Sequence, residues 1–150
     1  PEASQALTSS VSDATPSVGI QEKPSYPQEK TLSFDDLLRR LVMDIPGGIA
    51  GTITQLDGIG IASFSTDPDF PTVVADAELS AVMNNINKAA SSLSLGNMRE
   101  QYFVTAEYGF VLKPIGSFLL ILVVDANDLN WGLIQLHFEE LVPLIEKKLF

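Results

Sequence analysis

Apolar residues recur at helical spacing at the start of the second fifth of the chain. Ser33 is a favourable N-cap, and Asp35 and Asp36 follow it in what would be the first turn. The apolar stripe that follows consists of Phe34, Leu37, Leu38, Leu41, Val42 and Ile45, with Arg39, Arg40 and Met43 facing the other way. The pattern predicts a helix after Ser33 that is stopped by Pro46-Gly47-Gly48.

Two strands are predicted next, over residues 49–56 and 59–65. Asp57-Gly58 between them is typical of a two-residue hairpin of type I′, in which both central residues have positive φ. Residues 66–75 hold two prolines and two aspartates and are expected to form a loop.

A second amphipathic helix is predicted over about residues 76–95, with Gly96 at its C-terminal stop, and a last helix over about residues 129–148. The buried side of the second helix would be formed by Leu79, Val82, Met83, Ile86, Ala90 and Leu93. Between the two helices lie three predicted strands, residues 100–106, 110–115 and 118–124, with turns at Tyr108-Gly109 and Gly116-Ser117.

The strand 118–124 is apolar throughout and does not alternate, so both of its faces must be buried in the middle of a covered sheet. The short links favour antiparallel pairing. The order α-β-β-α-β-β-β-α therefore predicts an α/β fold, a three-layer α/β/α sandwich around a five-stranded, mainly antiparallel sheet. Residues 1–30 are rich in Ser, Pro, Gln and Glu without periodicity, and we interpret them as a disordered tail or linker before a domain at 31–150.

This arrangement resembles the Roadblock (dynein light chain type) family, of Roadblock/longin-like fold, and within it the bacterial MglB-like regulators of Ras-like GTPases. The matching stretches are residues 45–49 (IPGGI), 56–63 (LDGIGIAS), 118–125 and 130–134 (NWGLI). The loop 66–75 is longer than is usual in the family. The resemblance implies a homodimer or heterodimer in which the third strands pair edge to edge and the second helices lie side by side. It also implies a small Ras-like GTPase as partner, in settings such as bacterial cell polarity or motility, and no catalytic residues.

The composition disfavours several classes of partner and of chemistry. The formal net charge of −10 disfavours nucleic acid and anionic lipid surfaces as partners. The chain has no cysteine, which excludes disulfides and thiol chemistry and is compatible with a cytoplasmic protein. The longest apolar run, 118–124, is too short for a membrane span, and the first residues do not form a signal peptide.

Candidate chemistry is sparse, so we expect no enzyme, no cofactor and no metal. Gly47, Gly48 and Gly51 are not followed by the Lys-Ser or Lys-Thr of a phosphate loop, which leaves a helix stop and turn. His137 falls on the apolar side of the last helix and is expected to pack there. The carboxylate pairs Asp67/Asp69 and Asp125/Asp128 lack the further ligands of a calcium loop, although Asp128 or Asn130 suits the cap of the last helix.

Two surfaces are candidates for binding. The first is the predicted strand 100–106, which starts a meander that ends in the central strand and is therefore expected at the sheet edge. Tyr102, Phe103 and Val104 in it would form the dimer interface, because an open apolar edge favours pairing. The second is the outer face of the second helix, which carries a single charge and so suits the core of an interface. Its partner-binding residues would be Ser80, Asn84, Asn85, Asn87, Lys88 and Ser91.

These observations favour a non-catalytic dimeric platform that regulates or scaffolds a small Ras-like GTPase. A ligand-sensing domain of the PAS or GAF kind is an alternative, and it requires a hollow between sheet and helix. A purely structural domain for dimerisation or anchoring is another alternative. Among the arginines, Arg39 and Arg40 are expected on the opposite face, which leaves Arg99 as the candidate to act on a bound nucleotide.

Overall fold

The computed structural model describes residues 32–150, so the predicted tail over residues 1–30 lies outside the described residues. From Ser33 onward the chain forms one compact unit. Its elements are α2 (Phe34–Asp44), β1 (Gly48–Gln55), β2 (Gly60–Ser65), α3 (Thr72–Ser92), β3 (Gln101–Val104), β4 (Tyr108–Ile115), β5 (Phe118–Asp125), the 3-10 turn η3 (Ala126–Asp128) and α4 (Trp131–Leu149). The predicted order of helices and strands is confirmed.

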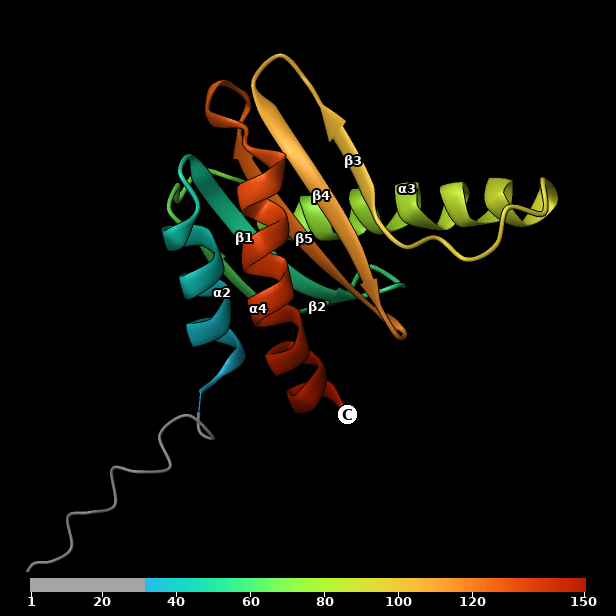
Figure 1. Ribbon diagram of the computed structural model, residues 1–150, viewed down its shortest axis with the longest axis horizontal. Helices are drawn as coiled ribbons and strands as arrows, with labels where there is room; N and C mark the ends of the chain where they lie inside the picture. Colours follow the sequence, from blue (N-terminus) through green and yellow to red (C-terminus); the bar gives the residue numbers. More distant parts are fainter. Residues whose placement is uncertain (1–31) are drawn as a thin grey trace, which may run out of the picture. The chain divides into compact units, whose positions relative to one another are not determined.

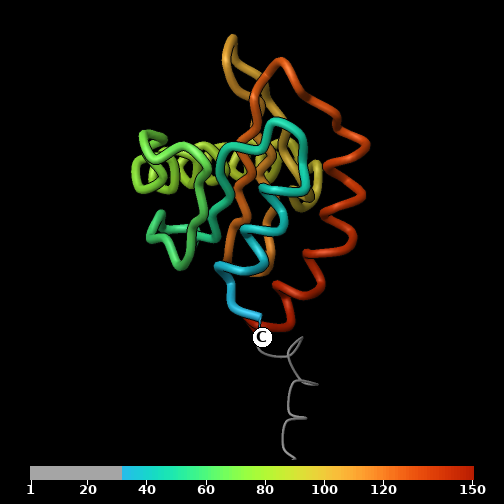
Figure 2. Tube along the Cα trace, turned by 90° about the vertical axis from the view of Figure 1, so that its left-hand side faces the viewer, coloured from blue at the N-terminus to red at the C-terminus, as the bar shows by residue number. Residues whose placement is uncertain are grey.

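The five strands form one antiparallel sheet in the order β2-β1-β5-β4-β3. Strand β5 is central, and its residues 119–124 are buried on both faces, as their unbroken apolar run predicts. Helices α2 and α4 cover one face of the sheet and α3 crosses the other (Figure 1). The tube in Figure 2 shows α3 and α4 on opposite sides of the strands, which confirms the three-layer sandwich.

Alternation along the strands supplies both hydrophobic layers. On the α3 face, Leu79 and Met83 of the helix pack on a cluster of sheet residues. That cluster consists of Ala50, Leu112, Leu119, Ile121 and Val123. The opposite layer is lined by the buried faces of α2 and α4, whose contributions are Leu37, Leu38, Leu41, Val42, Ile134, Phe138, Leu141, Val142 and Ile145.

Side-chain caps set the starts of two helices. Ser33 Oγ accepts a hydrogen bond from Asp36 N, and the Asp36 carboxylate accepts one from Ser33 N. This capping box holds the pKa of Asp36 below its usual value through the hydrogen bonds from Ser33. Asn130 caps α4 by accepting from Leu133 N at 3.0 Å, so Asn130 rather than Asp128 is the cap of the last helix.

The hairpin between β1 and β2 differs from the predicted type I′ turn. Gly58 has a positive φ of 92°, whereas Asp57 does not, so the two-residue assignment is wrong. Gln55 N donates to Ile59 O, and Gly58 N donates to Gln55 O. This pattern is typical of a three-residue loop, in which only the last residue has to adopt the left-handed conformation.

Tyr108-Gly109 is not a turn, and that prediction is wrong. Both residues lie in β4, and the turn is formed earlier, where Thr105 N donates to Tyr108 O at 2.7 Å. Gly109 is needed for another reason, because a Cβ there would lie 2.5 Å from a methyl carbon of Leu129. The glycine marks close packing against the segment before α4.

Helix α3 begins at Thr72, four residues before the predicted start. The last four residues of the predicted loop 66–75 therefore form the first turn of the helix. Val73 and Val74 in this turn are exposed, and they therefore add nothing to the apolar stripe from which the start was predicted. The helix also ends early, at the C-cap Leu93. Ser94 follows the cap with a positive φ of 56°, and Gly96, whose φ of 91° is also positive, lies two residues further on. Leu93, predicted on the buried side, is exposed for this reason.

Candidate functional site

Strand β3 lies at the edge of the sheet, where the sequence placed it, and has four residues. It pairs with β4 on one side and with no other strand of the described unit. Phe103 lies opposite Phe110, and Thr105 N donates to Tyr108 O. Because hydrogen-bonded pairs alternate in an antiparallel ladder, Phe103 N–H points toward β4 while the N–H groups of Tyr102 and Val104 point outward.

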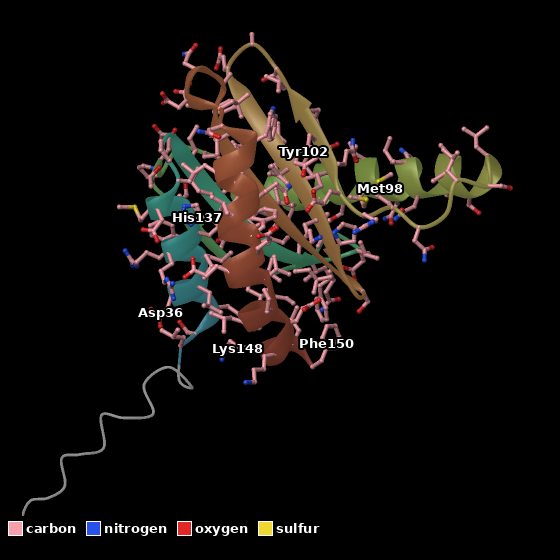
Figure 3. The ribbon with its side chains drawn as sticks, viewed as in Figure 1. Asp36, Met98, Tyr102, His137, Lys148 and Phe150 are labelled. Atoms are coloured by element: carbon pink, nitrogen blue, oxygen red, sulfur yellow. The ribbon has the colours of Figure 1, made fainter. Side chains whose placement is uncertain are left out.

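The side chains of β3 divide between the two faces of the sheet. Phe103 stacks on Phe110 with ring centroids 4.7 Å apart and packs toward the α3 layer. Tyr102 and Val104 face the α4 side and are 42% and 52% exposed. Tyr102 lies at the β3 edge in Figure 3, and its ring meets Trp131 edge to face at 4.9 Å. The three predicted interface residues thus form a continuous apolar edge.

A polar network orders this edge from the α4 side. The Tyr102 hydroxyl donates to Glu100, while Gln135 Nε2 donates to Glu100 Oε1 at 2.9 Å and also contacts the Tyr102 hydroxyl. Lys113 Nζ lies 3.3 Å from the other Glu100 oxygen. Burial raises the pKa of Glu100, but the hydrogen bonds from Tyr102, Gln135 and Lys113 outweigh it and hold that pKa below its usual value. Burial and the adjacent Glu100 raise the pKa of Tyr102 to about 12.

Only part of the predicted partner-binding set lies on the outer face of α3. Asn85 and Lys88 point away from the sheet, whereas Asn84 donates to Leu56 O and Asn87 and Ser91 border a groove along the helix. Asn84, Asn85, Lys88 and Ser91 are exposed, and Asn87 is half-buried. Ser80 does not belong to this face, because it is 1% exposed and its hydroxyl points to Gln55 O at 3.4 Å. Its helical position borders the buried stripe of Leu79 and Met83, so its place on the outer face was wrongly predicted.

The second half of α3 extends beyond β3 in Figure 1. All residues from Ser91 to Asn97 are exposed, including the apolar Leu93 and Leu95. A groove of about 660 Å³ runs beneath this end. Its lining residues are Leu56, Asn87, Ser91, Ser94, Gly96, Asn97, Met98, Pro114 and Gly116. The projecting end therefore offers both an outer face and an underside to a second molecule.

The other candidates for chemistry have structural surroundings. Arg39 stacks over the Phe64 ring at 4.7 Å and Arg40 pairs with Glu140 at 2.9 Å, both on the α2 side. Arg99 is exposed in the segment between α3 and β3. His137 is half-buried on α4 (Figure 3). Asp67 Oδ1 accepts from Asp69 N and Asp125 Oδ1 accepts from Asn127 N, so these acids shape local turns.

Comparison with known proteins identifies the architecture. No protein-family model and no curated protein matches the chain. Among solved structures, a Roadblock/LC7 domain from Streptomyces avermitilis matches with a TM-score of 0.71 at 17% identity, over 78% of this chain and 98% of that one. The chain has the Roadblock/LC7 fold.

Two further structures agree with this assignment. Myxococcus xanthus MglB matches with a TM-score of 0.69 at 16% identity, over 77% of this chain and 93% of that one. A structure described as MglB with tetrameric arrangement matches with a TM-score of 0.67 at 15% identity, over 89% of this chain and 95% of that one. At these identities the matches establish the fold, and the roles of individual residues have to be argued from their geometry.

One buried polar residue of this domain was not anticipated from the sequence. Asp76 lies on the buried side of α3, is 4% exposed, and its Oδ1 has no hydrogen-bond partner. Burial raises the pKa of Asp76, an effect that the adjacent Thr52 hydroxyl only partly opposes. The sequence does indicate its burial, because Asp76 lies three residues before Leu79, at a position where an amphipathic helix normally has an apolar side chain.

Replacing Asp76 by asparagine is expected to stabilise the domain at pH 7 by about 1 kcal/mol, since it removes a buried charge that no cation offsets. The unfolded chain releases this proton near pH 3.8 and the folded chain at a higher pH, so the wild type loses stability as the pH rises through that interval. The gain in melting temperature should therefore shrink between pH 7 and pH 3.5. Glu78→Gln, at an exposed position of the same helix, is the matched control. An equal gain in melting temperature at pH 7 and pH 3.5 would contradict the raised pKa of Asp76.

None of the helices in residues 32–150 is long and apolar enough to cross a membrane.

Proposed function

We propose that this chain forms a homodimer whose α3 helices bind a small Ras-like GTPase, and that it regulates or scaffolds that GTPase without catalytic residues of its own. The observation that carries the proposal is the outer face of α3, which has one charge between Ala81 and Ser92 in a chain of net charge −10. Asn85 and Lys88 on that face are exposed in the described part of the chain. The resemblance of the sequence to MglB-like regulators and the fold shared with MglB support a GTPase as the partner.

The dimer in this proposal is formed by strand pairing. Two β3 edges joined through their outward N–H groups would unite the two sheets into one continuous sheet. The projecting ends of α3 would then lie next to the partner subunit's sheet, which would cover the exposed Leu93 and Leu95. Two α3 faces side by side provide a polar surface able to bury the roughly 1,600 Å² of a specific interface.

The nucleotide state of the GTPase is expected to control binding. Switch loops are ordered by the γ-phosphate and released on hydrolysis, so the two states present different surfaces to α3. Arg39 and Arg40 lie on the other side of the sheet and are engaged by Phe64 and Glu140. We therefore expect any acceleration of hydrolysis to come from ordering of the switch loops, with the exposed Arg99 as the arginine to test.

The packing between α3 and the sheet supports this function over a ligand-sensing domain. Met83 is fully buried in the cluster that also contains Ala50, Leu112 and Ile121, so side chains fill the space that a sensor would keep for its ligand. The groove under the end of α3 opens to the surface and is lined by residues of the proposed contact.

Asn85→Glu and Ser91→Glu are expected to weaken GTPase binding about 30-fold each, or about 2 kcal/mol, because each would place a carboxylate in a desolvated contact. These positions are preferable to Asn84, whose side chain donates to Leu56 O at 2.9 Å and supports the fold. The GTPase would first be captured from the source cell with and without a non-hydrolysable GTP analogue, and its affinity then measured by calorimetry.

Asn127→Glu in η3 is the matched control for these substitutions, since it adds the same charge at an exposed site on another part of the domain. It should leave the affinity unchanged. If all three variants bound the GTPase with the affinity of the wild type, the GTPase would have to bind elsewhere. Capture of no GTPase in either nucleotide state would refute the regulatory function.

A further inference from the structure

The second edge of the sheet, formed by β2, is also open. Strand β2 pairs with β1 on one side and with no other strand of the described unit. Its sequence, GIASFS, contains neither a charged residue nor a proline, the devices that usually protect an edge from further pairing. Ile59 and Ile61 at its start are exposed, as is Val73 on the facing turn of α3. This edge is therefore competent to accept another strand.

The ladder shows which backbone groups are available. Ala50 lies opposite Ser65, and the neighbouring Thr66 N donates to Ile49 O at 2.8 Å. Hydrogen-bonded pairs alternate along an antiparallel ladder, so Phe64 is bonded to β1 while the N–H groups of Ser63 and Ser65 point to the open edge.

A groove of about 400 Å³ follows this edge on its α3 side. It is lined by residues 58–63 of the hairpin and by Thr72, Val73 and Asp76 of α3. Gly60 lets the Asp76 carboxylate approach the strand, because a Cβ at position 60 would lie 2.5 Å from Asp76 Oδ2. The groove thus contains a carboxyl group that is nearly fully buried and has an unpartnered oxygen.

We propose that the β2 edge binds an extended segment of another protein as an added strand, with a lysine or arginine side chain of that segment meeting Asp76 in the groove. Main-chain bonds to an open edge provide affinity in such complexes, and side-chain pockets provide specificity. A buried carboxylate whose charge no cation offsets is costly, and a cation that hydrogen-bonds to it lowers that cost.

The segments that could bind at this edge differ in whether they carry a positive charge for Asp76. The ion pairs among the described residues employ Arg40 and Lys113, and neither reaches Asp76. A second copy of this chain could offer the edge strands β2 or β3, but neither contains a lysine or arginine. Edge-to-edge pairing of two copies through these strands would therefore leave Asp76 without a cation, and we assign the site to a segment of a different protein. The site lies at the opposite edge of the sheet from β3, so it does not use the strand proposed for the dimer.

The test begins with selection from a phage-displayed library of random dodecapeptides on the full-length protein. Selected peptides should alternate apolar residues with one recurrent lysine or arginine. One such peptide would be synthesised with a fluorescent label in three forms: unchanged, with norleucine in place of the cation, and with N-methyl groups along one edge of its backbone. Affinities would be measured by fluorescence polarisation. We expect norleucine and N-methylation each to lower the affinity at least 10-fold.

Protein variants locate the site. Asp76→Asn should lower the affinity for the cationic peptide to that of the norleucine form while leaving the norleucine form unaffected. Ser63→Pro removes an outward N–H without breaking a bond to β1 and should weaken all forms, whereas Ser63→Thr keeps the N–H and should weaken none. Failure to select a cationic peptide, or equal binding of it to wild type and Asp76→Asn, would overturn the proposal. So would binding that survives backbone N-methylation.

Discussion

Proline at position 104 is expected to convert the protein from dimer to monomer. In light scattering at micromolar concentration, the wild type should have twice the chain mass of 16.2 kDa and Val104→Pro should have the mass of one chain. The N–H of Val104 points away from β4, so proline leaves the intramolecular ladder intact and removes a donor only from the dimer contact. The loss of one bond from each copy, together with steric conflict from the rings, should weaken association at least about 100-fold.

The choice of residue matters for this test. Phe103→Pro would remove an N–H that bonds to β4 and would disturb the stack on Phe110, so it would damage the fold as well as the interface. Val104→Thr is the matched control, since it retains the N–H and a β-branched side chain, and it should remain dimeric. A wild type with the mass of one chain would refute the dimer, and a dimeric Val104→Pro would show that copies associate through another surface.

The features that were predictable from the sequence are those that depend on periodicity. The helical stripe from Phe34 to Ile45 and the unbroken apolar run of β5 each have one physical explanation, a face or a strand that must be buried. The position of β3 at the edge followed from the central place of β5. These inferences need only the solvent preference of each side chain, which the sequence contains.

Features that depend on close approach between distant segments could not be predicted in the same way. Tyr108-Gly109 has the composition of a turn, yet position 109 requires glycine because Leu129 packs against it. Ser80 has the composition of an exposed helix face, yet the β1–β2 hairpin covers it through Gln55. The burial of Asp76 likewise depends on Gly60 and Thr52, which lie in other elements. The candidate site is therefore less predictable than the fold.

Gly48→Ala is expected to have the largest effect on stability. The sequence identified Gly47 and Gly48 as a helix stop, and Gly47 does adopt a positive φ of 78°. Gly48 has a separate constraint, because a Cβ there would lie 2.1 Å from the backbone oxygen of Val42 and 3.1 Å from that of Ile45. Val42 lies in the last turn of α2 and Ile45 is its C-cap, so relief of the clash requires the end of the helix and β1 to separate. We expect a loss of about 3 kcal/mol, at the upper end of the cost of overpacking.

Gly132→Ala provides the contrast that makes this prediction specific. Gly132 lies in the first turn of α4, and a Cβ there would meet only Asn130 Oδ1, at an ordinary contact distance of 3.7 Å. Alanine is favoured over glycine in a helix by roughly 0.5–1 kcal/mol, so this variant should gain stability. Chemical denaturation of the two variants compares the same change in composition at two sites. A Gly48→Ala protein as stable as Gly132→Ala would mean that α2 and β1 do not meet at the carbonyl of Val42, and the packing of α2 on the sheet would have to be revised.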